Sequence, residues 1–241
     1  MEHVFLVGVC GGVPHFSDYY NHVRLGDIIV SMPNQKGQIF IYCDKKGEDK
    51  ERNQVQFALK SWAPQDGLLR SISERIYDKS MTDPSFHPWE DFIYQGQQLL
   101  KGQEVAFERP RPETDRLFMN IGGDDVIEVG HPPMPDDARA VDRPGAPKIR
   151  LGAIASGKPL VQEDQLRMEF TARHQCVGVD TEFDQVLEAI IGSRKESFIC
   201  IRGVCDYYDG TRNVVWQPYS ALVAAAFMRA IIEKIPVHRA D

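Results

Sequence analysis

The carboxylate of Asp206 is the first group in this sequence whose surroundings suggest chemistry. It directly follows an apolar run, residues 196–205, of the kind that forms a buried strand. Partial desolvation at the end of such a strand raises the pKa of a carboxyl group and suits it to act as a general acid. The ordinary alternatives for an Asp in this place are that it caps a turn or pairs with Arg202. The rest of the chain has to decide between these roles.

Length, composition and charge exclude several classes of protein. The chain has 241 residues, of which 42% are hydrophobic and 26% charged, as in a globular protein, so disorder is excluded. Lys and Arg number 28 and Asp and Glu 35, which gives a net charge of −7. No general basic field is therefore present to hold nucleic acid or an anionic membrane.

Targeting and membrane segments are not indicated. The longest apolar runs, residues 4–9 and 221–228, are shorter than the ~20 residues that a membrane span needs. No basic stretch precedes residues 4–9, and Gly11-Gly12 follows, so a strand that ends in a turn fits better than a signal peptide. We expect a cytoplasmic protein with neither a membrane nor a nucleic acid as partner.

The cysteines and histidines give no metal-binding pattern. The five cysteines are odd in number and lie mostly in apolar stretches, which favours free, buried thiols in a reducing compartment. Neither C-x-x-C nor H-E-x-x-H spacing occurs among them and the seven histidines. We therefore expect no metal, no disulfide and no cofactor.

Hydrophobic patterning predicts alternating strands and helices. Short β-branched and aromatic runs predict strands at residues 4–9, 28–30, 38–42, 148–156, 172–179 and 196–206. Apolar residues at three and four spacing predict helices at residues 53–62, 67–77, 184–191 and 220–235. This alternation predicts an α/β fold with a mixed central sheet in three layers, flanked by helices on both faces.

The middle of the chain has a different composition. Nine of the fifteen prolines lie in residues 81–148, where continuous apolar runs are few. We interpret this stretch as a loop-dominated insertion, with short strands at residues 117–122 and 126–129, inside a single domain of residues 1–241.

Four ordered segments resemble the purine nucleoside phosphorylase and nucleosidase superfamily, which includes methylthioadenosine/S-adenosylhomocysteine nucleosidase. They match its glycine loop, its Gly-Asp strand, its Ser-Gly strand and the strand that ends in the catalytic Asp. The segments are Val7-Gly-Val-Cys-Gly-Gly-Val-Pro14, Leu25-Gly-Asp-Ile-Ile-Val-Ser31, Gly152-Ala-Ile-Ala-Ser-Gly157 and Ile201-Arg-Gly-Val-Cys-Asp206. Trp216-Gln-Pro-Tyr-Ser-Ala adds a likeness to the eukaryotic branch, which is fused to NACHT, ankyrin or tetratricopeptide regions.

The resemblance implies a role for each matching residue. Asp206 would protonate purine N7 and so improve the base as a leaving group, and Glu182 would accept hydrogen bonds from the ribose hydroxyls. The residue before that Glu, a methionine in the family, is Thr181 here. The positions implied to contact the base or the sugar through side chain or backbone are Leu160, Val161, Gly11 and Gly12.

After Thr181, a second departure from the family pattern shapes the expected activity. Val9 stands where the phosphorylases carry a Ser or Thr that holds phosphate, so hydrolysis is favoured over phosphorolysis. A phosphorylase would need an arginine in the pocket, and Arg167 and Arg202 are the candidates, although each also suits an ion pair. Ordinary packing and helix-start roles remain open for Leu160, Val161 and Glu182.

The third departure is that this chain does not show the N-terminal segment of the family, which includes the family's first strand. Its absence leaves a second interpretation open, namely a catalytically weak purine-sensing or interaction module. We expect a purine nucleoside or nucleotide as ligand. We also expect a homo-oligomer or a place in a larger multidomain protein, because a shortened sheet leaves an unpaired edge.

Overall fold

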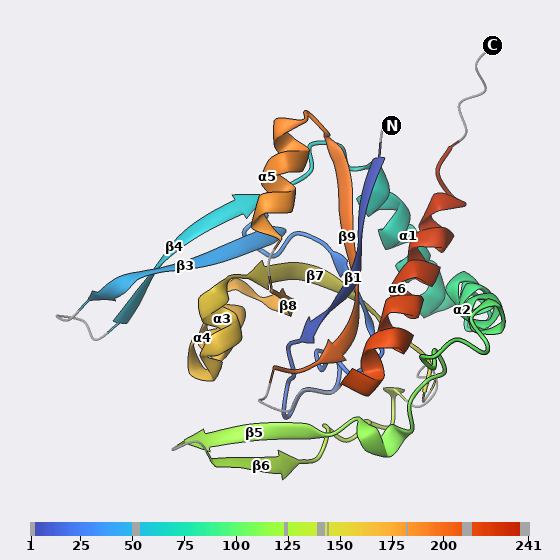
Figure 1. Cartoon of the computed structure of the whole chain (residues 1–241), viewed down its shortest axis with the longest axis horizontal. Coiled ribbons are helices and arrows are strands. Elements are labelled where there is room, and N and C mark those ends of the chain that lie inside the picture. The colour runs from blue at the N-terminus through green and yellow to red at the C-terminus, as the bar shows by residue number, and fades with distance from the viewer. Residues whose placement is uncertain are drawn as a thin grey trace.

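A seven-stranded mixed sheet is the centre of the molecule (Figure 1). The computed structural model describes residues 3–49, 54–122, 125–138, 143, 145–181, 183–208 and 214–236. The strands of this sheet are β1 (His3–Gly12), β2 (Ile28–Ser31), β3 (Phe40–Asp49), β4 (Gln54–Trp62), β7 (Ile149–Ser156), β8 (Cys176–Asp180) and β9 (Ser197–Asp206). The alternating pattern of the sequence therefore predicts the fold class correctly.

The sheet closes partly on itself. Its order is β2-β9-β1-β8-β7-β3-β4, and β2 also pairs with β7, so the first five strands form a ring. The hairpin of β3 and β4 extends from β7 beyond that ring (Figure 1). Strands β1 and β9 are parallel, whereas β8 is antiparallel to β1, which makes the sheet mixed as expected.

The helices cover the sheet on two sides. One group consists of α1 (Leu68–Thr82), α2 (Pro88–Leu99) and α6 (Gln217–Ile232). Within it, α6 packs on β9, β1 and β2, and α2 packs on α6 (Figure 1). The other group has α3 (Lys158–Gln162) against β3 and α4 (Asp164–His174) against β8. A further helix, α5 (Asp184–Gly192), links β8 to β9.

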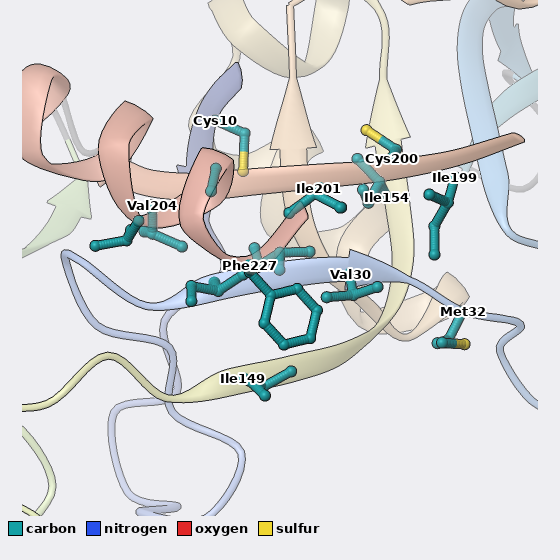
Figure 2. Close-up of a cluster of buried hydrophobic side chains, with 14 of the residues drawn as sticks. Cys10, Val30, Met32, Ile149, Ile154, Ile199, Cys200, Ile201, Val204 and Phe227 are labelled. Carbon is teal, nitrogen blue, oxygen red and sulfur yellow. The ribbon is translucent and has the colours of Figure 1, made fainter. Parts of the chain in front are cut away.

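Two clusters of buried side chains match these two groups of helices. The larger joins the sheet to α6, where Phe227 of the helix lies near Val30, Ile201 and Ile149 of three strands (Figure 2). The smaller lies under α3 and α4 and includes Phe170. Burial of large apolar side chains such as these contributes about 1.5–3 kcal/mol each, so both faces of the sheet hold their helices mainly by packing.

Helix α6 is a core helix by its surroundings. The segment Val214–Ile232, which includes the 3-10 turn η3 (Val214–Trp216), is long and apolar enough to cross a membrane by length and composition alone. More than half of that segment is buried inside the protein, and Phe227, Ala224 and Val223 have no exposed surface. Such burial is typical of the central helix of a globular domain.

Strand β4 corrects one prediction. We expected a helix over residues 53–62 because Val55 and Leu59 stand four apart, but residues 54–62 form a strand paired with β3. Apolar residues at 55, 57 and 59 also alternate, which is the period of a strand. Pairing with β3, in which Phe40 lies opposite Trp62, selects that alternative.

The proline-rich region contains more regular structure than expected. The two short strands predicted there form the hairpin of β5 (Leu117–Gly122) and β6 (Asp125–Val129), after a 3-10 turn at Pro112–Thr114. The hairpin lies beside the main sheet as a sheet of its own (Figure 1). The loop prediction was wrong for α2, in which Pro88 occupies the first turn and Glu90 and Asp91 stabilise the helix start.

Two element ends also differ from the predictions. Residues 172–174 end helix α4 instead of starting the next strand, because Gln175 takes a left-handed conformation that terminates the helix. Gly11 and Gly12 form no turn. They continue β1 as strand residues, paired with Val179 and Gly178 of β8.

Candidate functional site

A pocket of about 520 Å³ lies where β1, β8 and β9 end, a size typical of small-molecule sites. Its remaining wall comes from α3, α4 and the start of α6. The lining residues are Val9, Cys10, Val161, Gln162, Asp164, Asp180, Thr181, Cys205, Asp206, Tyr208 and Gln217. The candidate general acid therefore faces a cavity.

An irregular register brings Asp206 to this pocket. Along β1 and β9 the pairing is regular from His3 opposite Ser197 to Cys10 opposite Val204, and then shifts so that Gly11 lies opposite Asp206. Bulges of this kind redirect side chains at strand ends and are common beside active sites. The shift places both Cys205 and Asp206 among the lining residues.

The carboxylate of Asp206 is oriented by the backbone. Its Oδ1 accepts a hydrogen bond of 2.6 Å from the N–H of Tyr208. This is the turn-capping role that an Asp at a strand end commonly takes. The other ordinary role, an ion pair with Arg202, goes to Asp180 instead. A half-buried carboxyl that the backbone orients and that faces a pocket is suited to proton transfer to a bound molecule.

Tyr208 closes one side of the pocket. Its φ angle is 54°, an uncommon conformation for a residue other than glycine. Its ring lies over Gly11, where an added Cβ would be 2.2 Å from the Tyr208 Cδ2 atom. Burial raises the pKa of the Tyr208 phenol, so the hydroxyl stays protonated. The family resemblance implies that the missing side chain at Gly11 lets a sugar approach closely. In this structure the ring of Tyr208 occupies that space.

Arg167 connects the helical wall to Tyr208. Its Nη1 donates to the carbonyl oxygen of Leu160 at 2.9 Å, and its Nη2 donates to Oδ1 of Asp164 at 2.8 Å and to the carbonyl oxygen of Tyr208. The guanidinium also lies over the Tyr208 ring. The side chain is only 9% exposed, so these partners occupy it inside the protein. Arg167 is therefore a structural clamp in this state.

Asp180, which lines the pocket, forms a nearly buried ion pair with Arg202. The Nε atom of Arg202 lies 2.7 Å from Oδ2 of Asp180, and both side chains are nearly buried. Arg202 Nη1 also donates to the carbonyl oxygen of Leu6 at 2.9 Å, and Oδ1 of Asp180 accepts from the N–H of Thr181. Neither arginine proposed as a phosphate ligand thus faces the pocket without a protein partner.

Two lining thiols are held neutral. Burial raises the pKa of Cys10 well above its ordinary value and that of Cys205 to about 12, with the charge of Asp206 adding to the effect on Cys205. A thiol is a weak nucleophile until it loses its proton. The chemistry that this pocket supports is therefore acid–base chemistry by the carboxylate, without a cysteine nucleophile.

Of the other site residues predicted from the sequence, some line the pocket and others lie in the core. Val161 and Thr181 line the pocket with Asp206. Leu160 of α3 is fully buried in the smaller core cluster. Gly12 lies where an added Cβ would meet Val23 and Val204 at 2.8 Å. Glu182 lies outside the described residues.

Sequence reasoning did not single out several residues of the pocket. Asp180 ends β8 as Asp206 ends β9, so the same rule of a polar residue after an apolar strand points to it. Tyr208 lies two residues beyond the candidate acid, but its left-handed conformation has no local signal. In the described part of the chain, no group of three His, Cys, Asp or Glu side chains is arranged to hold a metal.

Comparison with known sequences finds a fungal relative. No family model matches the sequence. A nucleotide-binding leucine-rich repeat (NLR)-like protein from the fungus Hyaloscypha variabilis is 25% identical over 232 residues. The match covers 94% of this chain but 21% of the relative, so the chain spans about a fifth of that protein's length.

Comparison with solved structures finds nucleosidases. A Borrelia burgdorferi protein, described as a candidate 5′-methylthioadenosine/S-adenosylhomocysteine nucleosidase and solved with adenine, matches 98% of this chain and 70% of its own at 16% identity and a TM-score of 0.51. The corresponding nucleosidase of Neisseria meningitidis, solved with methylthio-immucillin-A, covers 97% of this chain and 70% of its own at 14% identity and a TM-score of 0.48. Futalosine hydrolase of Helicobacter pylori covers 98% and 69% at 11% identity and a TM-score of 0.49. At these identities the likeness concerns the fold, and the chain has the mixed α/β fold of the Borrelia protein.

Proposed function

We propose that this chain cleaves the N-glycosidic bond of purine nucleosides of the adenosine type, with Asp206 as the general acid. The observation that carries the proposal is that Asp206, fixed through Oδ1 by the Tyr208 N–H, faces a pocket of about 520 Å³ at the ends of three strands. Proton transfer from a positioned carboxyl group to the purine makes the base a better leaving group and accounts for about 10²–10⁴-fold in rate in other enzymes.

Hydrolysis is favoured over phosphorolysis by the composition of the pocket. Val9 lines it with an apolar side chain, which offers phosphate no hydrogen bond. The two arginines considered as phosphate ligands already have partners. Arg202 is engaged by Asp180, and Arg167 by Asp164 and two carbonyl oxygens. Water is then the acceptor of the ribosyl group, because phosphate would enter a site whose cations already have partners.

The experiment incubates the purified chain with methylthioadenosine or adenosine, with and without inorganic phosphate, and follows free adenine by chromatography. We expect adenine release that does not depend on phosphate and is lost in Asp206→Asn. Asp78→Asn, which changes an exposed carboxylate of α1, serves as the matched control and keeps full activity. Unchanged release in Asp206→Asn would refute the acid role. Formation of ribose-1-phosphate, or of its 5-methylthio analogue, would refute hydrolysis.

A second candidate function is a purine-binding sensor or interaction module without turnover. The similarity to an NLR-like protein, of which this chain spans only 21%, favours it, because a domain that reports to other domains needs ligand binding more than catalysis. Isothermal calorimetry separates the two functions. Saturable adenosine binding without adenine release would support the sensor, whereas release at a rate comparable to ordinary enzymes would exclude it.

A further inference from the structure

The hydroxyl group of Tyr208 is a polar group that the proposed reaction does not use. No described residue forms a hydrogen bond with it, whereas the backbone N–H and carbonyl oxygen of Tyr208 bond to Asp206 and Arg167. The phenol oxygen is also not among the buried polar atoms of the described residues that lack a partner, so it keeps accessible surface. Because Tyr208 lines the pocket at Asp206, a molecule in that pocket can reach this oxygen.

The register of the sheet shows where this hydroxyl points. Strand β1 lies between β9 and β8, and its Gly11 is opposite Asp206 of β9 on one side and Val179 of β8 on the other. Tyr208 follows the end of β9, and its ring passes over Gly11, where an added Cβ would be 2.2 Å from Cδ2 and 2.3 Å from Cε2. The hydroxyl is at the far end of the ring, so it points away from Asp206 and toward the end of β8.

The electrostatics of the pocket agree with this direction. Burial raises the pKa of the Tyr208 phenol most, and Cys10 and then Asp180 add more to the rise than Asp206 does. Because the effect of a charge weakens with distance, the hydroxyl lies nearer to the ends of β1 and β8 than to the candidate acid. The raised pKa keeps the phenol neutral, so it can both donate and accept a hydrogen bond.

The ring that carries the hydroxyl is held in place by its surroundings. It packs against the smaller core cluster, and the guanidinium carbon of Arg167 lies 5.6 Å from its centroid. The pocket has its volume of about 520 Å³ with the ring in this position, so the ring is part of the wall and leaves room for a ligand. A group that is fixed before binding loses little conformational freedom when a ligand arrives, so its hydrogen bond contributes more to affinity.

The place of this hydroxyl relative to Asp206 indicates which part of a nucleoside it meets. In the proposed function, on which this inference rests, Asp206 contacts the purine. The ends of β9 and β8 are two strand spacings of about 4.8 Å apart, so a group on the β8 side meets the part of the nucleoside that extends away from the base. That part is the ribosyl group, whose hydroxyls donate and accept hydrogen bonds as a phenol does.

We propose that the Tyr208 hydroxyl forms a hydrogen bond with a ring hydroxyl of the ribosyl group, at C2′ or C3′, and that Tyr208 is thereby a specificity-determining residue. The site then prefers a ribonucleoside to the analogue that lacks this hydroxyl. The bond holds the sugar and transfers no proton, so its loss is expected to raise KM more than it lowers kcat.

The test compares the wild type with Tyr208→Phe, which keeps the ring and removes only the hydroxyl. Adenosine, 2′-deoxyadenosine and 3′-deoxyadenosine are the ligands. Kinetics of adenine release give kcat and KM, and calorimetry in the Asp206→Asn background gives binding to the intact nucleosides. We expect Tyr208→Phe to weaken adenosine binding about 3- to 10-fold, the effect of losing one neutral hydrogen bond. For one of the two deoxy analogues the same substitution is expected to change nothing, because the partner hydroxyl is already absent.

Two controls separate this contact from other effects of the substitution. Tyr94→Phe removes a hydroxyl from an exposed position of α2 and is expected to leave binding and release unchanged. Free adenine, which has no sugar, should bind equally well to the proteins with and without the Tyr208 hydroxyl. Tyr208→Ala, which removes the ring as well, shows whether the ring itself helps or hinders the ligand.

Three outcomes would overturn the proposal. Equal losses for adenosine and both deoxy analogues would mean that the hydroxyl contacts neither ring hydroxyl of the sugar. Weaker binding of free adenine to Tyr208→Phe would place the contact on the base. Unchanged or tighter adenosine binding in Tyr208→Phe, or tighter binding in Tyr208→Ala, would mean that Tyr208 does not hold the sugar.

The same measurements separate this inference from the proposed function. Loss of binding for adenosine alone, without any release of adenine by the wild type, would refute cleavage and keep the contact to the sugar. Adenine release that Tyr208→Phe leaves unchanged for every nucleoside would refute the contact and keep the cleavage. Adenosine that does not bind at all would overturn both.

Discussion

The backbone N–H of Tyr208 donates a hydrogen bond of 2.6 Å to the Asp206 carboxylate, two residues earlier in the chain. The backbone of Tyr208 is itself left-handed, with φ at 54°, so the chain turns away after this residue. Its carbonyl oxygen is held by Arg167, and its ring rests on Gly11. The orientation of the candidate acid therefore depends on three residues that lie far from it in the sequence or outside its strand.

Gly11 tests whether the tyrosine ring positions the acid. In Gly11→Ala the new methyl group would lie 2.2 Å from the ring of Tyr208, so the ring has to move. We expect a loss of about 1–3 kcal/mol of unfolding free energy from overpacking, together with weaker adenosine binding. Chemical denaturation and calorimetry measure the two effects.

Gly192→Ala is the control for that substitution. An added Cβ at Gly192 meets no atom within 4 Å, and its φ is not positive, so both properties should stay unchanged. Gly11→Ala that is as stable as the wild type and binds adenosine equally well would show that Tyr208 adapts without affecting the site.

Arg167 is expected to stabilise the wall of the pocket. In Arg167→Met the Asp164 carboxylate and two carbonyl oxygens lose a nearly buried partner. Removing one partner of a buried ion pair costs about 3–5 kcal/mol, and the partial exposure of Asp164, at 31%, puts the expected loss near or below the lower end of that range.

Arg173 on the same helix is the matched control. It pairs with Glu169 at 2.5 Å, but both side chains are more than 40% exposed. Exposed pairs at this spacing contribute only about 0.3–0.5 kcal/mol, so Arg173→Met should change urea unfolding little. Equal effects of the two substitutions would contradict the clamp.

The fold could largely be predicted from local sequence patterns, and the elements that were predicted wrongly have local causes. Residues 54–62 carry apolar residues that fit both a strand and a helix period, and pairing with β3 decides between the two. The proline-rich composition does not predict helix α2, because proline usually marks loops. Pro88, however, lies in the first turn, where proline costs a helix no hydrogen bond.

The site could be predicted only in part, because most of it is assembled across the sheet. Asp206 carries a local signal, since it is a polar residue at the end of an apolar strand. The contact between Arg167 and Tyr208 joins residues 41 positions apart, and the shift that sets Gly11 opposite Asp206 belongs to the register of two strands. No spacing in one segment encodes either relationship.

His22 is expected to make the protein sensitive to acid. Its Nδ1 accepts from the N–H of His15 at 3.1 Å, and its Nε2 lies 2.9 Å from Nδ1 of His131. Burial, with His131 and neighbouring Arg24 and Arg150 adding to it, lowers the pKa of His22 from 6.5 to about 3. The unfolded chain therefore binds a proton below pH 6.5 that the folded chain does not, so stability falls as the pH drops from about 6.5 toward 3.

The matching measurement is the melting temperature between about pH 7 and about pH 5, a range above the titration of ordinary carboxylates. His22→Gln removes the titrating group but keeps an amide at this position, so its melting temperature should fall less with acid than that of the wild type. His15→Gln, which alters an exposed histidine of the same loop, should keep the wild-type slope. A wild-type slope in His22→Gln would assign the acid sensitivity to another group.

For the ion pair of Asp180 and Arg202, a single substitution is expected to lower the unfolding free energy, and a double substitution to recover most of that loss. Both side chains are close to 90% buried, and they meet at 2.7 Å between β8 and β9. In Asp180→Leu the guanidinium keeps its charge in a buried place without its carboxylate, which costs about 3–5 kcal/mol of unfolding free energy. In the double variant Asp180→Leu with Arg202→Met neither charge is buried, so most of that loss should be recovered, apart from the hydrogen bond to the carbonyl oxygen of Leu6.

Denaturant unfolding of the wild type, both single variants and the double variant gives the coupling energy. Additive losses would show that water screens the pair, and that the wall of the pocket behind Asp206 is wetter than the buried geometry implies.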